Sequence, residues 1–470
     1  MAYASATVRW IAGSVLALVP LAAGGCGGNS STGSSAGCGA LQTCCNAITS
    51  SGIAGSCLST LMSDQALPDS DQTCTASIGD YQSYCSGAGA DGGFDSTAPE
   101  AGGPTSHDAG QTELGFTPSN VNLQGIDTSS LVDVDIPTTD CTINTGFGGI
   151  SCASNATVTQ SIKQNANGVT IFVLYVKSFK IESNAVLSVS GNNPLAIVSL
   201  GPIDIEGQLL IDGQSSNPGA GGCEGILQQA GCGGPSNNGG GQAGTIGNST
   251  WTGGSGGGYC GAGGAGGAFG GASALPGGVA WGNASLIPFA GGSSGGGAND
   301  VTSGGGGGAI QLIAKTSIII GSSGSINAGG GGGGSIGGAF PGAGGGSGGA
   351  ILLEAPSVTI AGAIGANGGG GGSGDSNAGG DATPNSTPAA GGSASGSLAG
   401  GSGAAGSTAS GGAGKGSTTP MGSLNNGSAG GGGGGAGRIR INSTSGNVSV
   451  SGTVSPSLST SCATQGKLGA

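Results

Sequence analysis

The feature that most constrains the fold is a phrase of alternating apolar and polar residues that occurs four times and is followed by glycine-rich sequence. In its clearest form it reads Ala-Ile-Leu-Leu-Glu-Ala-Pro-Ser-Val-Thr-Ile-Ala-Gly-Ala-Ile-Gly, from Ala350 to Gly365. The other copies lie at 195–213, 309–320 and 438–454. Alternation with a period of two residues predicts β-strands, and its recurrence predicts coils that stack on one another. We therefore expect an all-β fold, a parallel β-helix or β-solenoid.

The alternation also predicts which side chains form the core. The inward set is aliphatic and comprises, in the first and third copies, Ile203, Ile205, Leu209, Ile211, Val358, Ile360, Ile364 and Ala366. Asp204 and Glu206 are expected to face outward. A glycine separates the last two short strands of three copies, at Gly207, Gly362 and Gly452. We expect these glycines at corners, where a positive φ or a bulge is favoured.

One run, Val169–Val176, is apolar throughout except at Thr170. It is far shorter than the roughly 20 residues that a membrane-spanning helix needs. An apolar run of this length indicates a strand that is buried on both faces. Strands are expected from Phe116 onward, so the predicted β-solenoid covers residues 116–470.

Glycine supplies 115 of the 470 residues, and its longest runs lie in inserts between the copies, at about 214–308, 328–349 and 367–437. Glycine loses the most backbone entropy on folding and has no side chain to bury. Two forms remain open: mobile loops on one face of the fold, or extended helices of the polyproline-II type packed side by side. The first insert also carries three cysteines and several large aromatic residues, which indicate a small ordered cap. They include Cys223, Cys232, Cys260, Trp251, Tyr259, Trp281 and Phe289.

Residues 1–25 have the pattern of an export signal. Arg9 precedes an apolar run that is too short to span a bilayer and that ends in Ala23-Gly-Gly-Cys26. The small residues before Cys26 resemble a bacterial lipobox, so we expect Cys26 to be acylated and to become the mature N-terminus. The alternative is ordinary cleavage near Ala23 or Gly24. Lipidation would anchor the protein in the bacterial outer membrane or at the cell surface.

The cysteine count fits an exported protein. Of 13 cysteines, Cys26 leaves an even number that suits disulfides in an oxidising compartment. The disulfide candidates are Cys38, Cys44, Cys45, Cys57, Cys74, Cys85, Cys141, Cys152, Cys223, Cys232, Cys260 and Cys462. The first six lie in residues 26–85, which we expect to form a small, mainly helical module stapled by disulfides. Residues 86–115 have the composition of a flexible acidic linker. Cys141 and Cys152 bracket a short loop and are expected to pair.

Several segments carry a family resemblance. They are Cys44-Cys45, Phe116-Thr-Pro-Ser-Asn120, Cys141-Thr-Ile-Asn144, and the phrase from Gly348 to Gly362 that continues into glycine-rich sequence. Together they make the chain similar to the glycine-rich exported lipoproteins of myxobacteria, which are often labelled PE-PGRS-like. The resemblance implies a cell-surface location and assigns no activity.

The charge distribution excludes several functions. The net charge is −13, and nine Lys and Arg residues provide no basic patch for a phosphate backbone, so we expect no nucleic-acid partner. The only histidine, His107, falls in the linker, and no two Cys-x2-Cys pairs face each other. We therefore expect no metal site and no cofactor. Arg438 and Arg440 share an outward strand face, where they could bind an anionic group or protect an edge strand from pairing.

The acidic residues offer one catalytic alternative. Asp204 and Glu206 are two residues apart on one strand face, about 7 Å in an extended strand, and Asp212 follows on the next strand. Paired carboxylates at such a distance serve in inverting glycoside hydrolysis. The same acids can simply keep an exposed strand soluble, and no aromatic, His or Arg residue accompanies them in the sequence. We expect a non-enzymatic surface protein with a structural or adhesive role in the envelope or matrix, in contact with polysaccharide or other surface proteins. A polysaccharide-binding or polysaccharide-degrading β-helix is the alternative.

Overall fold

The structure is a computed structural model that describes residues 113–123, 126–137, 140–146, 149–152, 160–247, 250–336, 340–394, 398–416 and 428–469. All of them belong to one unit of the chain, Pro104–Ala470. The predicted signal, the lipidation site at Cys26, the module with six cysteines and nearly all of the linker lie outside the described residues. The predicted linker ends slightly too late, because Leu114 is already buried and Glu113 lies 3.8 Å from Lys315.

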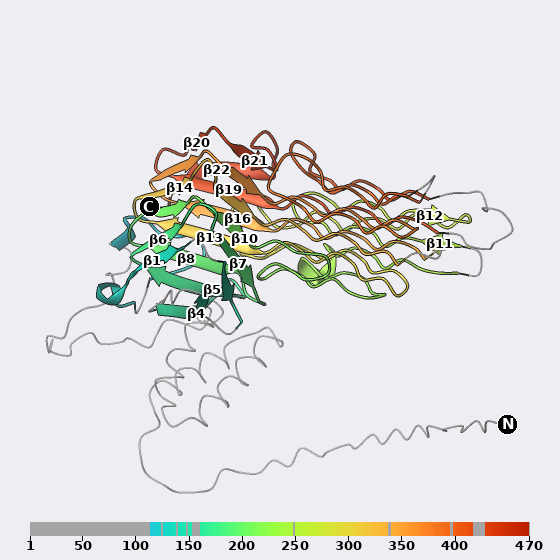
Figure 1. Cartoon of the computed structure of the whole chain (residues 1–470), viewed down its shortest axis with the longest axis horizontal. Helices are drawn as coiled ribbons and strands as arrows, with labels where there is room; N and C mark the ends of the chain where they lie inside the picture. The colour runs from blue at the N-terminus through green and yellow to red at the C-terminus, as the bar shows by residue number, and fades with distance from the viewer. Residues whose placement is uncertain are drawn as a thin grey trace, which may run out of the picture. The chain divides into compact units, whose positions relative to one another are not determined.

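The described residues form an all-β fold with three large sheets (Figure 1). The first contains, in spatial order, β1 (Asp133–Ile136), β6 (Ser178–Ile181), β9 (Ile203–Ile205), β14 (Ser317–Ile320), β17 (Ser357–Ile360) and β20 (Ser449–Val450). The second contains β21 (Thr453–Ser455), β18 (Ala363–Gly365), β15 (Ser325–Asn327), β10 (Gln208–Leu210), β7 (Val186–Ser190), β2 (Cys141–Asn144) and β3 (Ile150–Cys152). The third contains β22 (Ala463–Lys467), β19 (Arg438–Ser443), β16 (Ala350–Glu354), β13 (Ala309–Ala314), β8 (Leu195–Ser199), β5 (Val169–Val176) and β4 (Gln160–Ala166).

Each copy of the sequence phrase, called a coil below, contributes one strand to each of these sheets. The copies are β8-β9-β10, β13-β14-β15, β16-β17-β18 and β19-β20-β21, and β5-β6-β7 precedes them with the same order. Neighbouring copies pair in parallel, so equivalent residues stack: Leu174, Ile197, Leu312, Leu353 and Ile441 form one such row. The antiparallel pairs of the described chain are β2 with β3, β4 with β5, and the small β11 (Trp251–Thr252) with β12 (Ala268–Phe269).

The core lies between the three sheets. All eight residues predicted to face inward are buried in one aliphatic cluster, while Asp204 and Glu206 face outward and are partly exposed. Strand β5 is buried on both faces along most of its length, as predicted. Its outer face packs against a second cluster, to which the segment before the first strand contributes Leu114, Phe116, Val121, Leu123 and Leu131.

The corner glycines are required for a different reason from the predicted one. Gly207, Gly362 and Gly452 do not have a positive φ. A Cβ atom on any of them would instead lie within 3.0 Å of a backbone carbonyl oxygen of the preceding coil. For Gly452 that oxygen belongs to Gly362, so the corners stack directly on one another. Close stacking, and not an unusual backbone conformation, selects glycine here.

The described parts of the glycine-rich inserts are ordered segments that run side by side away from the three sheets, with β11 and β12 near their far end (Figure 1). In the run 428–437, amides three residues apart donate to the same neighbour. The bonds are Gly431 to Gly372 and Gly434 to Gly369, Gly430 to Lys415 and Gly433 to Gly412, and Gly432 to Gly254 and Gly435 to Gly257. Three residues per turn, with every bond made to another segment, is the geometry of a polyproline-II helix. The inserts therefore take the second of the two predicted forms.

The same run is enclosed on all sides. Its carbonyl groups accept hydrogen bonds from three further segments, through the amides of Gly342, Gly345, Gly348, Gly264, Gly267, Gly401 and Ala404. All three inserts thus contribute neighbours to one bundle. A Cβ atom on Gly431, Gly432 or Gly434 would lie within 3.0 Å of a neighbouring carbonyl oxygen. Glycine is the residue that lets the segments approach closely enough to pair.

Candidate functional site

The three acidic residues of the catalytic alternative do not form one site. Asp204 lies on β9 opposite Lys180 of the neighbouring strand β6. Burial raises the pKa of the Asp204 carboxyl and the nearby Glu206 raises it further, whereas Lys180 acts in the opposite direction. Lys180 is itself engaged by Glu182, 2.7 Å away. Asp204 is therefore one member of a charged row on the first sheet.

Glu206 is turned toward the next coil. The Ser323 hydroxyl donates to the Glu206 main-chain oxygen at 2.7 Å and to its carboxylate at 3.3 Å. The carboxylate lies over Gly321, where a Cβ atom would collide with it. Glu206 thus fastens one coil to the next, and neither it nor Asp204 lines a described pocket.

Asp212 lies two residues beyond the end of β10, an inner strand of the second sheet. It lines a small pocket of about 190 Å³ together with Ser188, Ser190 and Gln214. Burial raises the pKa of Asp212 to about 6, the bond with Gln214 opposes this, and the negative charge of Asp381 adds to it. Asp381 accepts hydrogen bonds from the amides of Ser215 and Gly332 at 2.8 and 2.7 Å. This pair of acids therefore lies where the inserts leave the strands, on a different sheet from Asp204.

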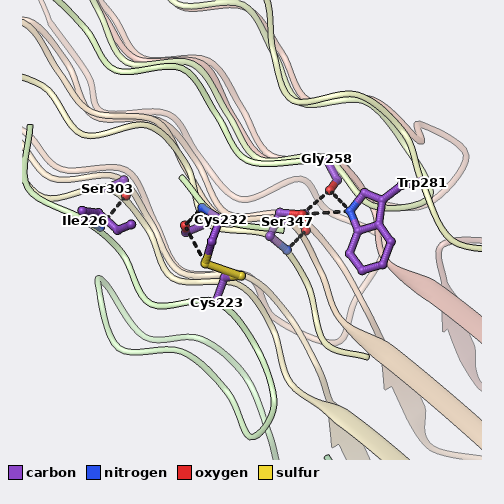
Figure 2. The surroundings of a disulfide bond; sticks show 9 residues. Cys223, Ile226, Cys232, Gly258, Trp281, Ser303 and Ser347 are labelled. Carbon is purple, nitrogen blue, oxygen red and sulfur yellow. Dashed lines mark hydrogen bonds between the residues drawn. A yellow bond between two sulfur atoms is a disulfide. The ribbon is translucent and has the colours of Figure 1, made fainter. Parts of the chain in front are cut away.

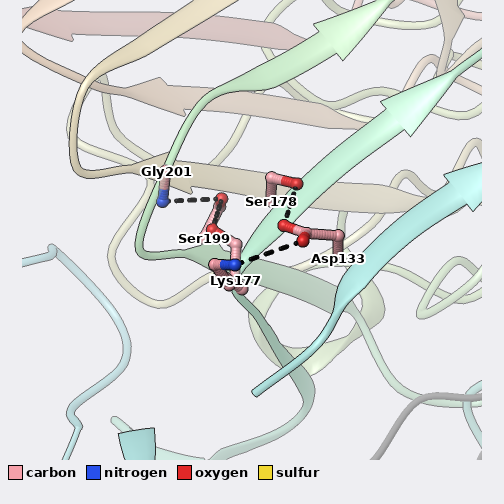
Figure 3. Close-up of polar contacts among 5 residues, drawn as sticks. All are labelled: Asp133, Lys177, Ser178, Ser199 and Gly201. Atoms are coloured by element: carbon pink, nitrogen blue, oxygen red, sulfur yellow. Dashed lines mark hydrogen bonds and ion pairs between the residues drawn. The ribbon is translucent and has the colours of Figure 1, made fainter. Parts of the chain in front are cut away.

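Polar contacts on the rim of the first sheet also have a structural role (Figure 3). The Ser178 hydroxyl donates to Asp133 at 2.6 Å, and Lys177 lies 3.3 Å from the same carboxylate. The bond from Ser178 holds the pKa of the Asp133 carboxyl below its ordinary value, and Lys177 adds to this effect. The Ser199 hydroxyl, on the third sheet, accepts from the Gly201 amide at 3.2 Å within its own coil and donates to the Lys177 carbonyl of the preceding coil at 3.3 Å. The bonds from Ser178 to Asp133 and from Ser199 to Lys177 therefore join adjacent coils.

A buried carboxylate organises the outer face of the third sheet. Glu354, at the end of β16, is 1% exposed. It accepts hydrogen bonds from Gln311 at 2.7 Å, from Asn442 at 3.0 Å, and from the hydroxyl and the amide of Ser119 at 2.6 and 3.2 Å. Four donors from three separate segments satisfy a group that would be costly to bury alone. Glu354 therefore holds the segment 113–123 against β13, β16 and β19.

An open pocket of about 440 Å³ lies next to this carboxylate. Arg440 and Asn442 of β19 and Lys467 of β22 line it, together with the hydroxyl-bearing residues Thr117, Ser119 and Ser285. The Arg440 Nε donates to Asn442 Oδ1 at 2.8 Å, and Nη1 donates to the Gln465 carbonyl at 3.0 Å. None of the residues that line the pocket is acidic.

The two arginines have different environments, and the predicted protection of an edge strand is wrong. Strand β19 pairs with β16 on one side and β22 on the other, so it is not an edge. Arg438 is half-buried and donates to the carbonyl oxygens of Trp281 and Gly282. Its guanidinium carbon lies 5.9 Å from the centre of the Tyr259 ring, and burial lowers its pKa. Arg438 is thus a packing residue, whereas Arg440 points into the pocket.

Three disulfides occur in the described chain. Cys141 pairs with Cys152, as predicted, and Cys223 pairs with Cys232. Cys260 pairs with Cys462 across 202 residues and connects the first insert with the end of the chain. The described part of the first insert is ordered, as predicted. It does not form a separate small cap, however, because its segments pair with those of the other inserts in the common bundle.

The surroundings of Cys223–Cys232 show how side chains support that bundle (Figure 2). The Ser294 hydroxyl accepts from the Cys232 amide at 3.0 Å, and the Ser303 hydroxyl accepts from the Ile226 amide at 2.9 Å. The Trp281 indole donates to the Gly258 carbonyl at 2.8 Å. Serine hydroxyls and one indole thus satisfy backbone groups between the extended segments.

Within the described ranges, no cluster of three or more His, Cys, Asp or Glu residues has the arrangement of a metal site. In the same part of the chain, no helix has the length and apolarity required to cross a bilayer. Comparison of the chain with protein-family models, with curated proteins and with solved structures gave no match.

Proposed function

We propose that this protein is a non-enzymatic surface protein in which a parallel β-helix supports a rigid glycine-rich bundle, with a structural or adhesive role in the envelope or matrix. The observation that carries the proposal is the enclosure of the run 428–437 by segments from all three inserts. In such a bundle the backbone N–H and C=O groups bond the segments to one another, and few side chains are available for chemistry. A rigid scaffold that presents its surface is the role for which this arrangement is best suited.

Two further observations support an exported location. Three disulfides in the described chain fit an oxidising compartment. The sequence pattern before Cys26 fits a lipid anchor, and the resemblance to myxobacterial lipoproteins points to the same location. We propose that the lipid on Cys26 tethers the protein to the outer membrane or cell surface and that the described unit faces outward.

The anchor is tested by metabolic labelling with palmitate in cells that express the wild type or Cys26→Ala. We expect label in the wild type and none in the variant, together with loss of the protein from the membrane fraction. Protease treatment of intact cells then tests surface exposure. Label retained in Cys26→Ala would exclude lipidation at this residue.

The non-enzymatic role is tested against polysaccharide degradation. The purified full chain is incubated with a panel of neutral and acidic polysaccharides, and the release of reducing ends is measured. We expect no release above background, because Glu206 bonds to Ser323 of the next coil, Asp204 lies opposite Lys180, and Asp212 follows a strand of another sheet. Hydrolysis that is abolished by Asp204→Asn would overturn the proposal.

A further inference from the structure

The pocket around Arg440 concentrates positive charge in a chain whose net charge is −13. Arg440 and Lys467 both line it. The ion pairs of the described chain involve Lys177, Lys180 and Lys315 instead. Arg440 and Lys467 therefore lack a carboxylate partner within the described residues, and a net positive recess lies on an otherwise acidic protein.

The Arg440 side chain is held in place before any ligand arrives. Its Nε bonds to Asn442 Oδ1, and the Asn442 amide nitrogen bonds to the buried Glu354. The guanidinium lies against Gly466 of β22, where any Cβ atom would collide with it. A guanidinium has five N–H groups, and the bonds to Asn442 and Gln465 use only two of them. The remaining N–H groups form a fixed fork of the kind that binds an oxyanion with two parallel hydrogen bonds.

Glu354 is linked to this fork through Asn442, and it does not line the pocket. Its two oxygens are taken up by Ser119, Gln311 and Asn442, and its side chain does not line the recess. Glu354 acts on Arg440 through Asn442, as an orienting group. It weakens the positive potential without blocking access to the guanidinium.

The rest of the lining is mostly polar. Thr117, Ser119 and Ser285 contribute hydroxyl groups, beside Pro118 and Gly469. The Ser119 and Ser285 hydroxyls donate to Glu354 and Asn283, so toward a ligand their oxygens serve as acceptors. A volume of about 440 Å³ falls within the range of small-molecule sites. Hydroxyl groups around an Arg–Lys pair suit a ligand that has one oxyanion and several hydroxyls.

We infer that this pocket binds one saccharide unit that carries a carboxylate or a sulfate, with Arg440 and Lys467 on the oxyanion and the hydroxyl-bearing residues on the sugar ring. The inference gives the proposed adhesive role a partner class. The inference rests on the proposed function only in placing this binding at the cell surface. Whether the pocket binds the saccharide does not depend on where the protein is located. Because the chain as a whole repels polyanions, a single acidic unit is favoured over a densely charged polymer.

The test uses the purified full chain and calorimetric titration with digalacturonate, a hexose sulfate, a neutral disaccharide and inorganic phosphate. We expect saturable binding of at least one acidic saccharide, weaker binding at high salt, and no binding of the neutral sugar. Arg440→Gln should weaken binding about tenfold or more, because it removes hydrogen bonds between charged groups. Lys467→Gln, at an exposed side chain, should weaken it by roughly three- to tenfold.

Lys415→Gln is the matched control, because Lys415 is exposed and lies in the bundle away from the pocket. It makes the same change in net charge and should leave the affinity within about twofold, since distant surface charges are screened. Failure of the wild type to bind either acidic saccharide would overturn the inference, as would equal weakening by Lys415→Gln. Phosphate binding as tight as saccharide binding would overturn the assignment to a sugar. None of these outcomes bears on the palmitate and protease tests of location.

Discussion

The amide of Gly432, in the third insert, donates a hydrogen bond of 2.9 Å to the carbonyl oxygen of Gly254, in the first insert. Three residues further along both segments, Gly435 donates to Gly257 at 2.8 Å. The two segments therefore run parallel and in register, although the sequence between them includes two complete coils. The same three-residue spacing recurs between other segments of the inserts, in parallel and in antiparallel pairs, and joins them into a single bundle of backbone-paired helices.

A methyl group inside the bundle should be poorly tolerated. At Gly432 a Cβ atom would collide with the Gly264 carbonyl, and backbone cannot move aside as a flexible side chain can. We expect Gly432→Ala to lower the free energy of unfolding by roughly 1–3 kcal/mol or more, measured by urea denaturation. Gly380→Ala is the control, because its Cβ would have the nearest atoms of Ala390 at 3.6 Å. It should be neutral or add roughly 0.4–1 kcal/mol. Equal effects of the two substitutions would contradict the close packing.

The two disulfides of the first insert should contribute unequally. Cys260–Cys462 closes a loop of 202 residues, whereas Cys223–Cys232 closes one of 9. Loop-closure entropy then gives about 5 kcal/mol for the first and about 2.5 kcal/mol for the second. We expect Cys260→Ser with Cys462→Ser to lower the melting temperature more than Cys223→Ser with Cys232→Ser, measured on matched samples. The reverse order would show that the long link between the first insert and the chain end is not required.

Stability should depend on pH through Asp212. Burial raises its pKa from an ordinary value of 3.8 to about 6, so between these values the folded chain holds the proton more tightly than the unfolded chain. This contribution to stability is fully present only below pH 3.8 and is lost as the pH rises through about 6. Asp212→Asn should therefore match the wild type at about pH 3 and exceed its free energy of unfolding by about 2–3 kcal/mol at pH 7. Asp375→Asn, at an exposed position, is the control. Parallel stability curves for the wild type and Asp212→Asn would contradict this account.

Glu354 should anchor the segment before the first strand. Glu354→Gln replaces one acceptor oxygen with a donor, which must then face Ser119, Gln311 or Asn442. We expect a loss of roughly 1–3 kcal/mol in the free energy of unfolding, because a buried hydrogen-bonding partner is lost. Limited proteolysis should also cut the segment 113–123 more rapidly in this variant. Unchanged stability together with unchanged cleavage would show that the carboxylate is not the anchor.

The strand repeat could be predicted from the sequence because its signal is local. Alternation identifies Ile203, Ile205 and the other inward residues without reference to any partner strand. The same holds for the strand Val169–Val176, where the apolar run itself specifies burial on both faces. Cys141 and Cys152 lie close together in sequence, so their pairing was also accessible.

The bundle and the pocket could not be predicted in the same way. A run such as Gly430–Gly435 has no side-chain pattern that reveals its period of three or its six neighbours. The pocket joins residues near 117, 285, 440 and 467, and its members meet only after the whole unit has folded. Asp204 and Asp212 are close in sequence but lie on different sheets, because the chain turns a corner at Gly207. Proximity along the chain was therefore misleading for the acids and uninformative for the pocket.

Hydrogen–deuterium exchange measures whether the glycine-rich inserts are held together by backbone hydrogen bonds. The amides of residues 430–437 and 342–349 all donate to backbone carbonyl groups of other segments and are buried in the bundle. We expect mass spectrometry of peptides covering these runs to show protection comparable to that of β13 and β16, lasting from minutes to hours. Complete exchange of these peptides within seconds, while the strands stay protected, would show that the inserts are loose loops and not a paired bundle.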